Sequence, residues 1–240
     1  MSVFSPGVQR IILALTLAVL GGCDVAPHMT IFEAAMTGNA VELARALKAG
    51  VSPNAKDEDD QTALHYAAAA GQLDVAKELV RSGADVRRVN SYYDTPLHKA
   101  AAGCHFELVR FLIGASADYE ARNKHGETPL HQAAACGDAR IVQFLIDSGA
   151  DPNASTKRGQ TPLHRAAERN NLAVVRVLVG AGRETITNAF APQMDTPLHI
   201  AARRGYLDLV RLLVASGADP NVPDERNKTP LHFAVREGHT

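Results

Sequence analysis

Thr-Pro-Leu-His at residues 128–131 begins a pattern that returns along the chain at a nearly fixed spacing. The same four residues, or the one-letter variant Thr-Ala-Leu-His, begin at Thr62, Thr95, Thr161, Thr196 and Thr229. Taken in chain order, the six start numbers rise by 33, 33, 33, 35 and 33. A fixed period of this length is typical of a protein built from stacked repeats.

Each repeat carries the signals of two short helices. Thr can cap a helix start and Pro suits the first helical turn. Two small residues such as Ala133-Ala134 then allow close helix packing, and an aliphatic run such as Ile141–Ile146 follows. Gly149 stands where the second helix should end, because glycine readily takes the left-handed conformation. One such helix pair cannot bury its own apolar face, so neighbouring repeats are expected to stack.

This pattern resembles the ankyrin repeat, a turn followed by two antiparallel helices. The resemblance covers residues 30–240 and implies an all-α ankyrin repeat solenoid. The first repeat lacks the Thr-Pro phrase, as a terminal cap can. The last has one helix, and it is either a C-terminal cap or a repeat cut short. The expected repeats are 30–61, 62–94, 95–127, 128–160, 161–195, 196–228 and the partial 229–240.

The N-terminal segment has a different character. Arg10 is its only charge before Asp24, and an apolar run over residues 11–20 is interrupted only by Thr16. Ten residues are too few for a membrane span and suit a secretory signal. The ending Leu20–Cys23 resembles a bacterial lipoprotein signal. We therefore expect a signal peptide over 1–22, a lipid on Cys23 and a tether over 23–29, which would place the chain on the periplasmic side of a bacterial membrane. An uncleaved anchor is the alternative.

Two further cysteines, Cys104 and Cys136, occupy neighbouring positions of adjacent repeats. Export would bring them into an oxidising compartment, where a disulfide could join the two repeats. The alternative is two unpaired thiols, because stacked helices lie about 10 Å apart and a disulfide needs Cα atoms within about 7 Å.

No motif indicates an enzyme. The sequence has no phosphate-binding glycine loop and no nucleophile elbow, so no catalytic residue and no cofactor is expected. In the family that the chain resembles, the phrase histidines form hydrogen bonds within and between turns. The other four histidines show no ligand spacing, so no metal is expected. A formal net charge of −1 argues against a nucleic-acid partner.

In ankyrin repeats the turn tips and the exposed side of the first helix line a concave groove. Here the first tip is acidic (Asp57–Asp60), and the next carries Tyr92 and Tyr93. Positive charge follows toward the C-terminus. The tyrosines are the best candidates for an interface, and the positive half would attract an acidic surface. A solvated face is the alternative for these charges. The basic candidates are Lys124, His125, Lys157, Arg158, Arg169, Arg203, Arg204 and Arg236.

The repeat over 161–195 has two extra residues before Thr196 and includes the sequence Ala189–Met194. Surface loops accept such length at little cost, so a tolerated insertion is one interpretation and an apolar contact point for a partner is the other.

The expected function is a lipid-anchored scaffold that binds a protein partner through the groove without catalysis. Two alternatives remain open: an inhibitor or immunity protein that neutralises a toxin or hydrolase, and an exported effector that binds host proteins.

Overall fold

The computed structural model describes residues 29–181 and 195–239, so the expected signal peptide, Cys23 and the sequence 189–194 lie outside the described residues. The described chain is helical except for turns and one isolated bridge between Lys56 and Thr62. Its helices are α2 (Ile31–Thr37), α3 (Ala40–Lys48), α4 (Ala63–Ala70), α5 (Leu73–Arg81), α6 (Pro96–Ala102), α7 (Phe106–Gly114), α8 (Pro129–Cys136), α9 (Ala139–Asp147), α10 (Pro162–Glu168), α11 (Leu172–Gly180), α12 (Pro197–Arg204), α13 (Leu207–Ala215) and α14 (Pro230–Arg236).

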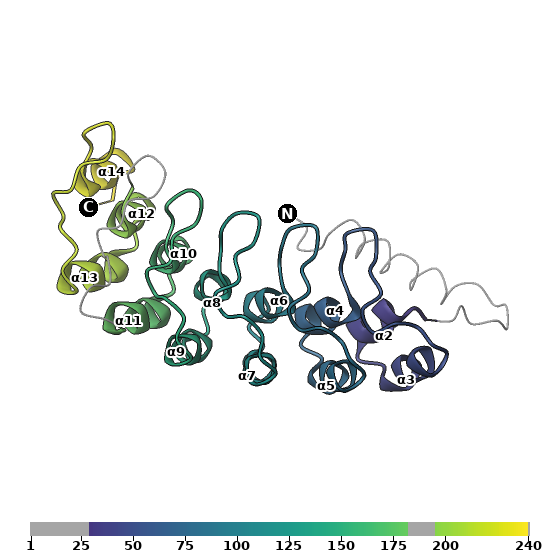
Figure 1. Ribbon diagram of the computed structural model, residues 1–240. Helices are drawn as coiled ribbons and strands as arrows, with labels where there is room; N and C mark the ends of the chain where they lie inside the picture. Colours follow the sequence, from purple (N-terminus) through teal and green to yellow (C-terminus); the bar gives the residue numbers. More distant parts are fainter. Residues whose placement is uncertain (1–28, 182–194, 240) are drawn as a thin grey trace, which may run out of the picture. The chain divides into compact units, whose positions relative to one another are not determined.

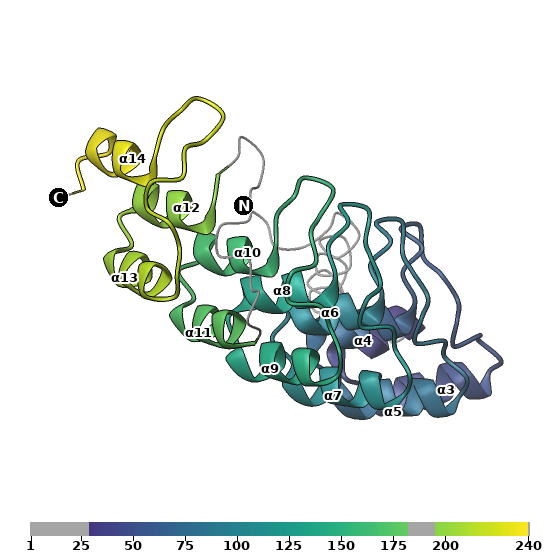
Figure 2. The ribbon, with the colours of Figure 1, turned by 60° about the vertical axis from the view of Figure 1, so that its left-hand side comes forward.

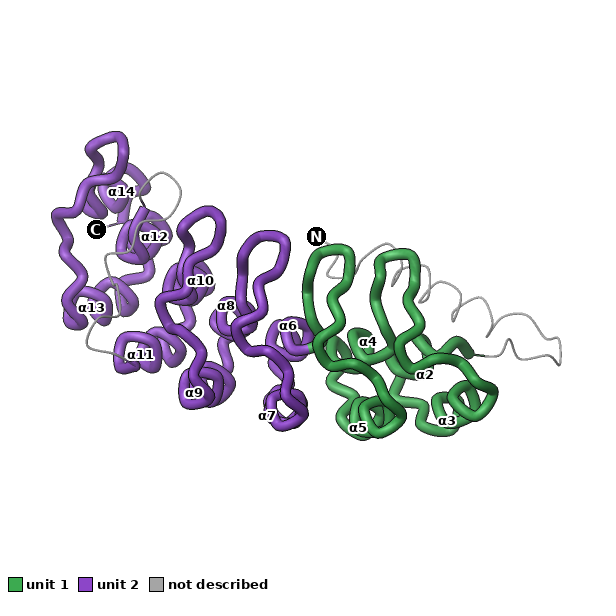
Figure 3. Tube along the Cα trace, viewed as in Figure 1, with its two compact units in different colours: residues 1–96 green, residues 97–240 purple. Residues whose placement is uncertain are grey.

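The chain divides into two compact units, residues 1–96 and 97–240 (Figure 3). In the first, α2 packs on α4, and each packs on the second helix of its own repeat, α3 or α5. In the second, the first helices α8, α10, α12 and α14 pack in one row, and the second helices α7, α9, α11 and α13 pack in another (Figures 1 and 2). Each unit is therefore a two-layer stack of helix pairs.

The phrase residues begin each first helix as the sequence predicts. Thr128 has extended backbone, its N–H donates to the His131 ring, and Pro129 takes the first helical position. Gly137 then ends α8 in the left-handed conformation, with φ +98°. The same arrangement, with a threonine cap and a proline in the first turn, recurs at α10, α12 and α14.

In each internal repeat, the leucine of the phrase lies in the buried core of the stack. Leu64, Leu97, Leu130, Leu163 and Leu198 are at most 1% exposed. Alanines such as Ala133 and Ala134 are fully buried beside them, because only small side chains let neighbouring first helices approach. Burying one leucine stabilises the fold by about 1.5–3 kcal/mol, so this position contributes strongly in every internal repeat.

The last repeat differs in exposure. Leu231 occupies the same phrase position but is 69% exposed, and Val235 in the following turn of α14 is 70% exposed. Phe233, on another side of α14, is buried against α12. Within residues 29–181 and 195–239, no helix is long and apolar enough to cross a membrane.

Cys104 and Cys136 form a disulfide in the structure, and their Cα atoms are 5.7 Å apart. Cys136 is the last residue of α8, while Cys104 follows α6 at the position where the next repeat has Gly137. Cys104 also keeps the left-handed backbone of that position, with φ +60°. The Cα distance is within the range of a disulfide, whereas the spacing of the helix axes alone left the bond open.

Candidate functional site

A side chain at a fixed position closes each described turn between repeats. Asn123 accepts hydrogen bonds from the N–H groups of His125 and Glu127, at 2.9 and 3.0 Å. Equivalent residues do the same elsewhere, as is usual for Asp, Asn and Thr in tight turns. This role was not predicted from the sequence, although these residues recur with the period of the repeat and could have revealed it. The equivalent acceptors are Asp57, Asn90, Thr156 and Asp224.

The phrase histidines hold the turns to the helices. The His131 Nδ1 accepts from the Thr128 N–H, so its Nε2 carries the hydrogen and donates to the Gln160 carbonyl at 3.1 Å. Gln160 is the residue just before the next phrase, and the same bond to the equivalent carbonyl forms from His65, His98, His164 and His199. Burial lowers the pKa of His131 to about 4, so the ring is neutral and structural at physiological pH.

The acidic tip of the first unit is partly used for its own structure. The Tyr66 hydroxyl donates to Asp57 at 2.6 Å, and burial together with this bond raises the pKa of Tyr66. Asp60 pairs with Lys56 at 3.0 Å. Glu58 stays exposed at the end of the tip. Asp57, Glu58 and Asp60 thus differ in their availability to a partner.

Tyr92 and Tyr93 both lie at the surface of the first unit, 47% and 56% exposed. Tyr93 has a φ of +59°, a left-handed conformation that is strained for a bulky side chain. The equivalent positions in two turns of the second unit are Gly126 and Gly159. The chain therefore keeps one of the two exposed rings, that of Tyr93, at a cost in backbone strain, and such strain clusters at functional sites.

The basic tips of the second unit come together around one hollow of about 400 Å³. Lys124 and His125 line it from one turn, and Lys157 and Arg158 from the next. All four side chains are exposed. The sequence predicts these residues on neighbouring tips, and the structure shows that they share a single surface depression.

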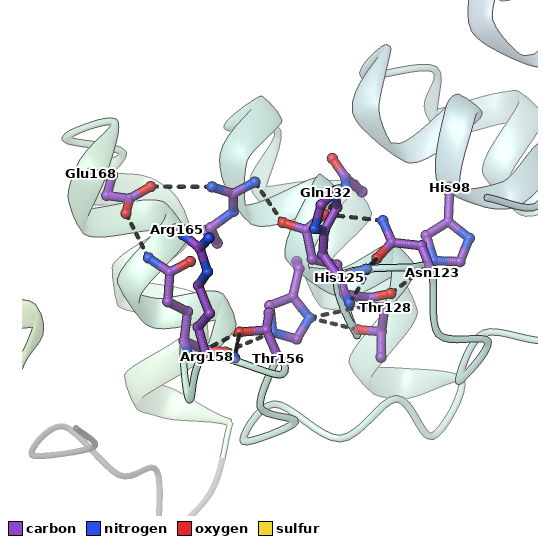
Figure 4. A network of polar contacts seen from close by, with 12 residues as sticks. His98, Asn123, His125, Thr128, Gln132, Thr156, Arg158, Arg165 and Glu168 are labelled. Carbon is purple, nitrogen blue, oxygen red and sulfur yellow. Dashed lines mark hydrogen bonds and ion pairs between the residues drawn. The ribbon is translucent and has the colours of Figure 1, made fainter. Parts of the chain in front are cut away.

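A polar network that the sequence analysis missed forms the base of this hollow (Figure 4). Arg165 on α10 donates to Glu127 at 2.6 Å and to Glu168 at 3.3 Å. The other Glu127 oxygen accepts from Asn123 at 3.0 Å and from Gln132 at 2.8 Å. Because Arg165 and Glu127 are 38 positions apart in sequence, their pairing appears only once adjacent repeats are stacked.

The four predicted helix arginines have different surroundings. Arg169 and Arg204 are exposed. Arg203 instead pairs with Asp195 at 2.7 Å and lies 4.3 Å from the centre of the Phe233 ring. Arg236 pairs with Glu237 and lies 5.1 Å from the same ring. Arg203 thus joins α12 to α14 and is less free to bind a partner than the tip residues, whereas the contacts of Arg236 lie within α14 and the residue after it, and its side chain stays exposed.

Within the described parts of the chain, residues 29–181 and 195–239, no group of three or more His, Cys, Asp or Glu side chains could hold a metal ion. What the tips and the hollow offer chemically is charge and aromatic surface for recognition.

Known proteins with similar sequences and structures agree with this architecture. A family model of three ankyrin repeats matches residues 31–123 and 107–189, and a second ankyrin repeat model matches 196–240. No curated protein matches the chain. The crystal structure of the human ASB11 ankyrin repeat domain is similar, with a TM-score of 0.78 and 26% identity over 85% of this chain and 90% of that one.

The ankyrin repeat domain of Bcl-3, described as a unique member of the IkappaB protein family, is also similar. Its TM-score is 0.70, with 33% identity over 85% of this chain and 92% of that one. The structure is thus an all-α ankyrin repeat solenoid, a protein–protein interaction scaffold. With repeats matched over most of its length, the chain belongs to the ankyrin repeat family.

Proposed function

We propose that this protein is a non-enzymatic scaffold that is lipid-anchored on the periplasmic side of a bacterial membrane and binds a protein partner through its turn tips and first helices. The observation that carries the binding role is Tyr93, because an exposed ring is kept there in a backbone conformation that glycine would adopt without strain. Tyrosine is among the residues that contribute most to binding energy at interfaces.

The binding role can be tested at Tyr93 by separating stability from recognition. Replacing Tyr93 with Gly removes the ring and relieves the left-handed strain, so we expect a stability gain of up to about 1 kcal/mol together with weaker partner binding. The partner is first isolated by affinity capture from membranes and identified, and its binding to wild type and Tyr93→Gly is then measured by calorimetry.

Tyr92→Ala is the companion variant. It removes a neighbouring exposed ring at a residue whose backbone is not left-handed, so no backbone strain is relieved. Partner affinity that is unchanged in both variants would rule out this tip as a contact. If capture instead yields one enzyme whose activity the scaffold abolishes, the inhibitor interpretation replaces that of a passive scaffold.

The lipid anchor rests on the sequence Leu20–Cys23 after the apolar run, in a part of the chain outside the described residues. Several acyl chains hold a protein firmly at a membrane, whereas one chain binds it only marginally. Replacing Cys23 with Ala should therefore move the protein from the membrane fraction to the soluble fraction. Mass spectrometry of the wild-type N-terminus provides the direct check, and a mature chain without lipid on Cys23 would refute the anchor.

A further inference from the structure

The basic hollow of the second unit has the charge of an anion-binding site. Its lining contains four cationic side chains, Lys124, Lys157, Arg158 and Arg165, and a single carboxylate, Glu127. Arg165 also pairs with Glu168, so the lining cations together with these two carboxylates leave an excess of two positive charges, histidine left out of the count, around about 400 Å³ of space. A surface depression with one sign of charge concentrates groups of the opposite sign.

The walls of the hollow are fixed before any ligand arrives. The Lys157 N–H donates to the His125 carbonyl at 3.0 Å, which joins the two tips directly. Arg122 strengthens the same junction by donating to the Ser155 carbonyl at 2.7 Å and to the Gly126 carbonyl at 3.3 Å. A binding site whose backbone is already ordered loses less entropy when it binds, so these bonds favour recognition.

Glu127 does not neutralise the cations at the rim of the hollow, which are Lys124, Lys157 and Arg158. Its two oxygens already accept from Arg165, Asn123 and Gln132, so its charge is matched within the base of the hollow. Among the described residues, the rim cations Lys124, Lys157 and Arg158 form no ion pair. The Arg165 Nε is buried and has no hydrogen-bond partner. The positive charge at the rim is therefore available to a ligand.

The charge of the chain and the small extent of the hollow favour an acidic peptide over a nucleic acid as the ligand. Nucleic-acid binders neutralise many phosphates in series and are usually strongly basic, whereas this chain has a formal net charge of −1. In contrast, one extended peptide needs to place only two or three carboxylates over two adjacent tips. Arginine and lysine at fixed positions form charge-assisted hydrogen bonds with such carboxylates.

We infer that the hollow between residues 123–127 and 156–160 is a carboxylate-binding subsite that receives an acidic, extended segment of the protein partner. This inference rests on the proposed scaffold function and names the chemistry of its partner. The Lys157 and Arg158 side chains bind the carboxylates of the segment, and Lys124 extends the contact along the first of the two tips.

The test measures binding of a fluorescent hexaglutamate peptide to the full-length chain by anisotropy in 50 mM salt, with hexaglutamine as the uncharged counterpart. We expect hexaglutamate to bind and hexaglutamine not to bind. The double variant Lys157→Gln/Arg158→Gln should weaken hexaglutamate binding at least tenfold. The matched control Arg176→Gln/Arg211→Gln removes two exposed charges from α11 and α13, in the other helix layer, and should change binding less than twofold.

Equal losses in the two double variants would overturn the inference, because binding would then follow net charge alone. Displacement of hexaglutamate by an equal concentration of inorganic phosphate would also overturn it, because the hollow would then bind any compact anion. The scaffold function has its own readout in the captured partner. If that partner binds Lys157→Gln/Arg158→Gln as tightly as wild type, the scaffold function holds and the subsite assignment fails.

Discussion

Removing the disulfide should destabilise the protein by an amount that its loop length defines. The bond closes a loop between residues 32 positions apart, and the chain-entropy relation gives about 4 kcal/mol at 25 °C for a loop of this size. In Cys104→Ser/Cys136→Ser, the unfolded chain regains this freedom while the helices and the leucine layer stay in place. We therefore expect the free energy of unfolding to fall by about 3–4 kcal/mol.

A second variant separates the cross-link from the backbone. Cys104 has φ +60° at the position where the next repeat has Gly137, and this conformation costs a non-glycine residue about 1–2 kcal/mol. Cys104→Gly/Cys136→Ser lacks the bond but fits the conformation, so it should be about 1 kcal/mol more stable than the double serine variant. All variants carry Cys23→Ser, so that thiol counts report only on the pair.

The assay is urea denaturation followed by far-UV circular dichroism, with the cysteine state verified by thiol labelling of the unfolded protein. At a typical dependence of about 1–3 kcal/mol per molar urea, the midpoint of the double serine variant should fall by more than about 1 M. A midpoint unchanged from that of the oxidised wild type would refute the cross-link argument. A glycine variant less stable than the serine variant would refute the backbone argument.

Two further predictions concern the second unit. The folded-state pKa of His131, about 4, lies below its value of about 6.5 in an unfolded chain, so its contribution is complete above pH 6.5 and decreases toward pH 4 by about 1.4 kcal/mol per pH unit. The stability advantage of wild type over His131→Gln should thus shrink by about 2 kcal/mol between pH 7.5 and pH 5, and a constant advantage in urea titrations would contradict the burial argument. Gly126→Ala should cost more stability than Gly217→Ala. Both positions have positive φ, but only at Gly126 would a Cβ lie 2.9 Å from the Lys157 nitrogen. Equal losses in thermal melts would show that the tips separate freely.

The helices and their order were predictable from the sequence because the residues of the phrase determine where each helix begins through local contacts. Thr128 and Pro129 begin a helix and Gly137 ends it, and each acts through bonds to residues only a few positions away. The sequence alone leaves the disulfide open for a physical reason. The spacing of helix axes does not give the distance between residues at the helix ends, which is 5.7 Å between the Cα atoms of this pair.

The candidate site was predictable in composition and less so in arrangement. The tip residues Lys157 and Arg158 could be placed on a turn by their position in the repeat. The ion pair of Arg165 with Glu127 depends on how one repeat lies on the next, which no local pattern encodes. Arg203 was grouped with the binding residues, but its stacking on Phe233 depends on a helix more than twenty positions away.

The covalent link between Cys104 and Cys136 also governs how the molecule responds to force. When the chain is pulled from its two ends, tension passes through the sulfur bridge and bypasses the 32 peptide steps between the cysteines. The loop between the cysteines, about 110 Å of contour length, adds to the extension only after a reductant cleaves the bond. A protein held at one end and loaded at the other would therefore extend less in an oxidising environment than in a reducing one.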